Sequence, residues 1–492
     1  MNDENEAPMD DGVSENLLGI RQEDETWRII KNRLYLSHGL YVWNSRVFEF
    51  GFALFLVDLF PDSLLAPSIY SFCCCLAGIL FSSHVGEFVT KTNRLTLIRH
   101  SIFIQRTAVL VPTVALLVIY LAENQNIELL KALPGIRVGL LCMFTLGGSI
   151  EKLCGIANKI SMARDWLVTI CHGDDNLYLQ LSVKLRFIDL TCKLVGPTFI
   201  SFLVGINIDL ALIFIIVMNI ISNYVEWYAI ARIYNLVPQL REGYLSPGLE
   251  SSELSPSPQL PPVTLPSPSL SPIDTTVPTP PPSKKRSVII ENIRSFLSQP
   301  MWGPSLALAM LYLTVLSFGT QTVAFLLSYP DITPPMIGIL KAVSTLFELS
   351  STTITPMLVK RIGIINSAFV FILSEFLFLC PILVGFVLDL PYKHWMICIF
   401  IPFSRIGLWG YDIAVNNMIP KYVKDNEIRS RFTAVEESLM GIFELLMYLL
   451  TVILNRPQSF KWPVLVTICS VGGAVAMYSQ FWIRVLSGRL KL

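Results

Sequence analysis

Charged residues are scarce in this sequence. They make up 15% of its 492 residues, whereas soluble globular proteins usually carry about 25%. Hydrophobic residues make up 53%, which is too much apolar side chain for one soluble core, because such cores stop growing near about 250–300 residues. Most of the chain is therefore expected to face lipid. The formal net charge is zero and no basic stripe is present, which excludes a nucleic-acid-binding surface.

Catalytic and nucleotide-binding motifs are also missing. The sequence contains no Walker A motif, no GxSxG and no HExxH, and its five histidines are isolated. We therefore expect no enzyme activity and no cofactor. The ten cysteines, among them Cys73, Cys74 and Cys75, lie in or beside apolar runs without CxxC spacing, so neither disulfides nor a zinc site is expected.

A cleavable targeting segment is not expected either. The first twenty residues contain several Asp and Glu residues and no Lys or Arg. A signal peptide begins with basic residues, and an organelle transit peptide is rich in Arg and poor in acids. This acidic start fits neither pattern.

Long apolar runs predict about twelve membrane-spanning helices, since one bilayer crossing needs about 20 mainly apolar residues. The predicted spans are 37–58, 64–89, 98–121, 134–161, 183–205, 208–232, 302–328, 333–358, 362–388, 393–419, 430–454 and 462–483. Lys and Arg concentrate in the even-numbered gaps between these spans. By the positive-inside rule, both termini and the long middle segment should face the cytosol.

The predicted fold class is an all-α membrane protein that resembles major-facilitator transporters, with two six-helix lobes. The predicted parts are an acidic cytosolic tail (1–34), an N lobe (35–235), a cytosolic linker (236–297), a C lobe (298–486) and a short cytosolic tail (487–492). The linker has many prolines and little apolar content, which predicts a disordered tether. Its Ser-Pro pairs and its PPPSKKR stretch leave open kinases or a Pro-motif-binding domain as partners.

The first span contains unusual polar residues for its depth. Ser45 and Glu49 are four residues apart and share one helical face. Ionisable groups inside a membrane are costly and are by default functional candidates. Glu49 is therefore a candidate ligand for a cation, and the alternative is that it pairs with Arg46 to ease insertion.

The sixth span is a second candidate region. Its sequence MNIISNYVEWYAI places Asn219, Ser222 and Asn223 within about one turn and Glu226 a turn further. Amide and hydroxyl oxygens at this spacing suit a partly hydrated divalent ion, especially where a helix is broken and frees carbonyl groups. The alternative is that these groups hydrogen-bond neighbouring helices.

Several motifs in order along the chain carry a resemblance to a known family. They are YLSHGLYVWNSR, FLVDLFPDSLLAPSIY, ARDW with RFID after it, NIISNYVEW, LYLTVLSFGT, SRIGLWGYDIAVNNMI and VILNRPQSF. The chain resembles the ferroportin family, the solute carrier family 40 exporters of ferrous iron, and is most similar to its plant branch. The resemblance covers nearly all of the sequence outside the acidic tail and the linker.

This resemblance implies particular site residues. Asn219 and Ser222 match family metal-site positions, whereas the family's first-span Asp is Ser45 here and a nearby His is Glu49. In the C lobe, Thr320 and Val475 replace the Cys and His of the vertebrate branch, which implies that a second metal site is absent. The conformation-coupled charged residues of the family, which act in gating, correspond to Arg94, Asp165, Asp189, Arg405 and Asp412.

Together these observations predict an alternating-access transporter that exports Fe²⁺ from the cytosol, with Co²⁺ and Ni²⁺ as further candidate substrates. The predicted metal ligands are Glu49, Ser45, Asn219 and Ser222. We expect a monomer in the lipid bilayer, in the plasma membrane by family default and in a vacuolar or other intracellular membrane as the alternative. Two other functions remain open: an organic-solute facilitator, and a non-transporting scaffold that acts through the linker.

Overall fold

The computed structural model describes residues 11–61, 63–125, 134–162, 166–171, 174–242 and 293–487. All regular elements in these ranges are helices, which confirms the predicted all-α class. The N-terminal half contains α1 (Asp11–Leu59), α2 (Leu65–Lys91), α3 (Arg94–Asn124), α5 (Pro134–Ser161), α6 (Leu167–Cys171), α7 (Asp175–Ile206), α8 (Ile208–Leu236) and α9 (Gln239–Glu242). The C-terminal half contains α11 (Trp302–Leu311), α12 (Thr320–Leu327), α13 (Pro334–Ile362), α14 (Ile364–Val387), α15 (Lys393–Tyr422), α16 (Asn426–Ile453), η2 (Pro457–Phe460) and α17 (Lys461–Leu486).

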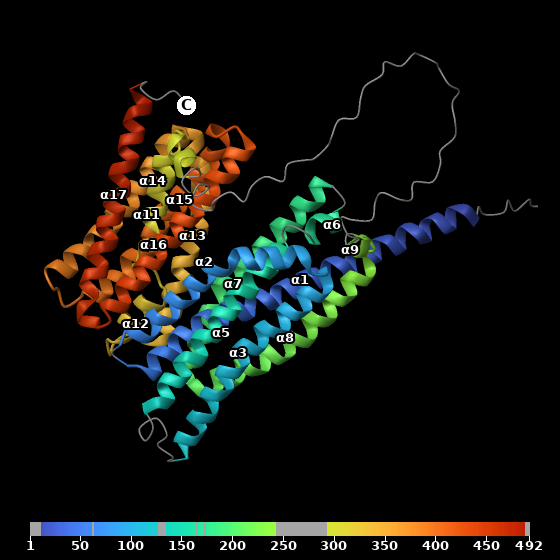
Figure 1. Cartoon of the computed structure of the whole chain (residues 1–492), viewed down its shortest axis with the longest axis horizontal. Helices are drawn as coiled ribbons and strands as arrows, with labels where there is room; N and C mark the ends of the chain where they lie inside the picture. Colours follow the sequence, from blue (N-terminus) through green and yellow to red (C-terminus); the bar gives the residue numbers. More distant parts are fainter. Residues whose placement is uncertain are drawn as a thin grey trace, which may run out of the picture.

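The helices form two bundles, one from each half of the chain (Figure 1). In the N lobe, α1 packs against α7 and α8, and α3 and α2 both pack against α5. In the C lobe, α15 packs against α13 and α14, while α17 covers α11 and α14. One of these close approaches requires glycine, because a Cβ atom at Gly407 of α15 would lie 2.7 Å from backbone atoms of Phe371 and Glu375 on α14.

Helix α1 is longer than the membrane crossing predicted for it. It begins at Asp11, inside the predicted acidic tail, and its first part extends past the neighbouring helices (Figure 1). Ile30 and Leu34 of this extension are buried in a small apolar cluster with Trp166 and Ile230. This part of the predicted tail therefore packs onto the N lobe.

Nine of the described helices are long and apolar enough to cross a membrane. The predicted seventh, eighth and eleventh spans are not among them. Helix α13 contains Lys341 and Glu348 at mid-length, and α16 contains Glu436 and Glu444. The eighth and eleventh spans are therefore more polar than the other spans, whereas the seventh is apolar but divided into two short helices.

The seventh predicted span, 302–328, is not one helix. Helix α11 ends at Leu311 and α12 begins at Thr320, with irregular backbone between them. Such backbone is tolerated at membrane depth only where its polar groups find partners inside the protein. Here Val315 N–H donates to Thr467 Oγ1 at 3.0 Å, and Val315 C=O accepts from Thr322 Oγ1 at 2.5 Å. The sixth span, where sequence reasoning considered a break, is the continuous helix α8.

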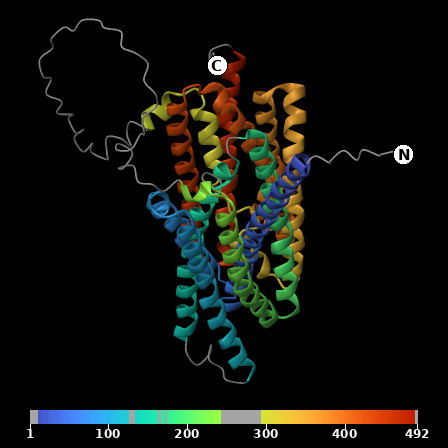
Figure 2. The same ribbon diagram turned by 90° about the vertical axis from the view of Figure 1, so that its right-hand side faces the viewer.

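The two lobes are joined by contacts at one end of the molecule and at mid-height. We call the end at which α1 ends and α2 begins the far end, and the opposite end, at which α8 ends and α11 begins, the linker end (Figure 2). At the far end, Leu64 N–H donates to Asn455 C=O at 2.8 Å, and Thr198 Oγ1 donates to Gly338 C=O at 3.2 Å. Closer to mid-height, Lys193 of α7 pairs with Glu348 of α13.

Candidate transport site

The two predicted ligands on α1 have different partners. Ser45 Oγ donates to Glu151 Oε1 of α5 at 2.9 Å, and Gln105 Nε2 of α3 donates to the same oxygen at 3.1 Å. Glu49 instead accepts from Arg46 Nη1, one turn earlier on α1, at 2.9 Å. The structure therefore shows the Arg46 pairing that the sequence left open.

Glu49 is accessible to solvent but lies among cations. Its side chain is 65% exposed, although the residues on either side of it, Phe48 and Phe50, are buried. Besides Arg46, the ammonium groups of Lys341 on α13 and Lys152 on α5 lie within electrostatic range of its carboxylate. A dication at Glu49 must therefore compete with positive charges that the protein itself supplies.

The predicted ligands on α8 are enclosed in the N lobe. Asn207 caps the start of this helix by accepting from Asp209 N–H at 2.7 Å. Asn219 is 2% exposed and its Nδ2 donates back to Ile215 C=O at 2.8 Å, which leaves its buried Oδ1 atom without a hydrogen-bond partner. Ser222 is also buried and accepts from Asn44 Nδ2 of α1 at 2.7 Å. The Asn44–Ser222 bond is of the kind that joins neighbouring helices in membranes.

A buried ion pair lies beside these groups. Arg106 of α3 donates to Glu226 of α8, and their side chains are 5% and 1% exposed. Sequence reasoning noticed Glu226 but missed Arg106, whose signal was a cation well inside the third span. Because a buried carboxylate needs a compensating charge, Arg106 gives Glu226 an internal counter-ion.

In this state each of the four predicted metal ligands has its own hydrogen-bond partner. Ser45 belongs to the Glu151 network, Ser222 bonds Asn44, Asn219 bonds its own helix, and Glu49 pairs with Arg46. Within the described ranges, no group of three or more His, Cys, Asp and Glu side chains is close enough to hold a metal ion. Thr320, at the position of the family Cys, shares a 2.6 Å hydrogen bond with Ser71, while Val475 packs into the apolar core on α17.

Cations of the C lobe satisfy the irregular segment of the seventh span. Arg405 of α15 donates to Leu316 C=O, and Lys341 Nζ donates to Phe318 C=O at 3.1 Å. Freed carbonyl groups in a broken helix are potential cation ligands. In this protein two of them already bind the side-chain cations of the chain.

The predicted gating residues are distributed over both lobes. Arg94 Nη1 donates to the carbonyl groups of Gln239 and Leu240 at 3.4 Å, and Asp189 of α7 accepts from His38 of α1 at 2.8 Å when the imidazole carries its proton on Nε2. Both contacts lie within the N-terminal half of the chain, the first between α3 and α9 and the second between α7 and α1. Arg405 and Asp412 lie two helical turns apart on one face of α15. Asp165 lies outside the described residues.

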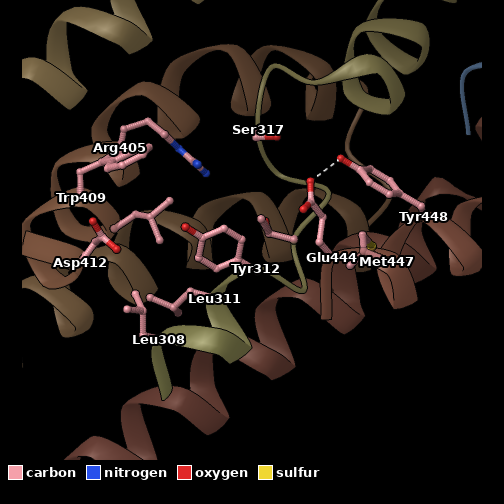
Figure 3. Close-up of a pocket in the computed structure, with 12 residues that line it drawn as sticks. Leu308, Leu311, Tyr312, Ser317, Arg405, Trp409, Asp412, Glu444, Met447 and Tyr448 are labelled. Carbon is pink, nitrogen blue, oxygen red and sulfur yellow. Dashed lines mark hydrogen bonds between the residues drawn. The ribbon is translucent and has the colours of Figure 1, made fainter. Parts of the chain in front are cut away.

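Arg405 and Asp412 line a cavity of about 220 Å³ on the inner side of the C lobe (Figure 3). Its other lining residues come from α11, the irregular segment, α15 and α16. They are Leu308, Leu311, Tyr312, Thr314, Ser317, Leu408, Trp409, Glu444, Met447 and Tyr448. Sequence reasoning missed Glu444, although a carboxylate within a predicted span was a usable signal.

Two lobes of membrane-spanning helices around charged inner faces define a multi-pass membrane transporter, and comparison with solved structures supports this class. The fold matches a bacterial homologue of the iron transporter ferroportin in its inward-facing state, with a TM-score of 0.71 at 18% identity over 92% of this chain and 98% of that one. An outward-facing structure of a bacterial homologue gives 0.55. The xylose transporter XylE from E. coli gives 0.52 at 12% identity over 92% of this chain and 97% of that one.

Sequence comparison identifies the family. The Ferroportin1 (FPN1) family model matches residues 28–471, so the chain belongs to the ferroportin family. It is 26% identical to solute carrier family 40 member 2 of Arabidopsis thaliana over 92% of this chain and 89% of that one. It is 23% identical to ferroportin of Homo sapiens, over 93% and 92% of the two chains. The predictions of the family, of the major-facilitator-like fold and of a transporter instead of an enzyme are confirmed.

Proposed function

We propose that the protein exports ferrous iron from the cytosol by alternating access. Family membership supports the substrate, and the pattern of contacts between the lobes supports the mechanism. The observation that carries the proposal is that Glu49, at 65% exposure, faces the space between the lobes while hydrogen bonds join the lobes at the far end. With the linker end in the cytosol, this is an inward-open state.

The proposed path begins at carboxylates that face the space between the lobes. Glu49 of α1 and Glu444 of α16 both lie within electrostatic range of Lys152. In the empty transporter, Arg46 and Lys152 offset the charge of these carboxylates. An incoming Fe²⁺ displaces the side-chain cations, and the lobes then rock about the bound ion.

The inner ligands in this proposal are Ser45, Asn219 and Ser222. Asn219 contributes its buried and unpartnered Oδ1 atom, which a small rotation of the side chain would direct to the ion. Oxygen ligands bind divalent transition metals less selectively than imidazole or thiolate ligands do. We therefore include Co²⁺ and Ni²⁺ as further substrates.

Iron transport into proteoliposomes that have the linker end outside would test this proposal. Glu49→Gln and Asn219→Ala should each lower the initial rate of ⁵⁵Fe²⁺ uptake into the vesicles, and Co²⁺ and Ni²⁺ should compete with it. Glu437→Gln is the matched control, because Glu437 is an exposed carboxylate on α16. Unchanged rates in both site variants would refute the ligand assignment, and absence of iron transport by the unmodified protein would refute the function.

The remaining proposals concern the cellular context. We propose a monomer in the plasma membrane, which a fluorescently tagged copy and size measurement in nanodiscs would test. Residues 243–292, which make up most of the linker, fall outside the described residues. Deleting residues 246–283 should leave iron flux intact in a transporter, whereas a scaffold that recruits kinases or Pro-motif-binding domains would lose its function.

A further inference from the structure

The cavity in the C lobe has a wall that does not suit a bare metal ion. The rings of Tyr312, Trp409 and Tyr448 line it together with the side chains of leucines and Met447 (Figure 3). A hydrated dication prefers several oxygen ligands in one shell. Small organic molecules, by contrast, bind in mainly apolar pockets with a few placed polar groups.

Asp412 supplies a negative charge at one end of this cavity. Its carboxylate accepts a hydrogen bond from Asn416 Nδ2 at 3.2 Å. Within the described part of the chain, no basic side chain forms an ion pair with it. A half-buried carboxylate with a neutral partner retains a strong preference for a cationic ligand.

The other charged groups of the cavity already have partners of the chain itself. Arg405 donates to Leu316 C=O and lies within electrostatic range of the buried carboxylate of Glu375. Glu444, on the other side of Tyr312 (Figure 3), accepts from Tyr448 Oη at 2.8 Å and lies near Lys152. The negative charge of Asp412 is therefore available for a cationic ligand to neutralise.

The aromatic residues around Asp412 add a second preference for a cation. Trp409 lies one turn before Asp412 on the same face of α15, and Tyr312 faces both from the end of α11 (Figure 3). Lys193 of the N lobe already places its ammonium group 4.9 Å from the centre of the Trp409 ring. Aromatic faces attract ammonium groups in this way, and organic amines bind to such sites in proteins.

We propose that this cavity binds a small protonated organic amine with an apolar body. The ammonium group binds Asp412, and the body packs against Tyr312, Trp409 and the leucine side chains. At about 220 Å³, the cavity is smaller than the about 300 Å³ at which typical small-molecule sites begin, so the ligand is a simple amine. Because the cavity opens beside the proposed ion path, a bound amine also slows iron efflux.

A binding experiment with the full chain in nanodiscs tests the proposal without iron. The ligand is 2-phenylethylamine, and its neutral isostere 2-phenylethanol controls for partitioning into lipid. The amine should raise the melting temperature and change the tryptophan fluorescence in a saturable way, and the alcohol should not. Asp412→Asn should weaken amine binding at least tenfold, while Glu437→Gln should leave it unchanged.

Equal effects of the amine and the alcohol, or an unchanged amine titration in Asp412→Asn, would overturn the proposal. Should Asp412→Asn fail to fold, Trp409→Leu provides the second variant, with the same expected direction and the same refuting result. Iron efflux measured on the same preparations separates the two proposals. If the unmodified protein transports iron but does not bind the amine, the amine site alone is refuted.

Discussion

Arg106 and Glu226 form an ion pair inside the N lobe, between α3 and α8, with side chains 5% and 1% exposed. A pair at this depth is costly to assemble, and removal of one partner is more costly still, because the other charge is left buried alone. The predicted ligands Asn219 and Ser222 are buried on the same helix as Glu226.

Arg106→Ala should therefore destabilise the protein strongly. Removal of one partner of a buried pair costs about 3–5 kcal/mol. Arg46→Ala is the control, because its pair with Glu49 is accessible to water and exposed pairs contribute about 0–1 kcal/mol. Thermal unfolding in nanodiscs should show a much larger drop in melting temperature for Arg106→Ala, and equal drops would contradict the buried-pair argument.

Arg46→Gln should strengthen metal binding, because it removes a cation that competes for the Glu49 carboxylate. In a site open to water, one unit charge at contact distance is worth about 1 kcal/mol, or about fivefold in affinity. Fe²⁺ competition curves in the efflux assay should show a lower half-saturating concentration for Arg46→Gln and a higher one for Glu49→Gln. A shift in the same direction for both variants would show that charge at Glu49 does not control metal binding.

A cross-link at the far end should stop transport. Leu64 N–H and Asn455 C=O are hydrogen-bonded across the lobes at 2.8 Å, so cysteines at these two positions lie within reach of a disulfide. The double variant Leu64→Cys/Asn455→Cys should lose most of its efflux under oxidation and regain it under dithiothreitol. Each single variant is the control, and full activity of the oxidised, cross-linked protein would rule out far-end opening as part of the cycle.

The fold could be predicted from the sequence because each membrane crossing needs about 20 mainly apolar residues, and such runs are visible in the sequence. Spans such as α14 and α15 consist of long apolar runs, and the two-lobe arrangement followed from their number and from the Pro-rich middle segment. The break between Leu311 and Thr320 could not be predicted, since its carbonyl groups bind Arg405 and Lys341 from distant parts of the chain. The sequence near the break does not indicate which distant side chains will donate hydrogen bonds to its carbonyl groups.

The candidate site was predicted less completely for the same reason. Residue types on α1 and α8 identified polar positions, but several of their partners come from other helices: Glu151 for Ser45, and Arg106 for Glu226. Glu49 differs, because its partner Arg46 lies one turn away and was visible in the sequence. Whether Glu49, Asn219 and Ser222 bind metal stays a prediction.

The polarity of α13 has a consequence for how the protein is made. A lysine or an acidic residue at the centre of an isolated helix costs about 2.5–3.5 kcal/mol on insertion into a bilayer, and α13 contains Lys341 and Glu348. This helix is therefore a poor substrate for insertion on its own during synthesis. Its charges find Phe318 C=O and Lys193 in neighbouring spans that are synthesised earlier. Entry of the eighth span into the membrane should thus depend on the fifth and seventh spans, and a C lobe without the fifth span should insert poorly.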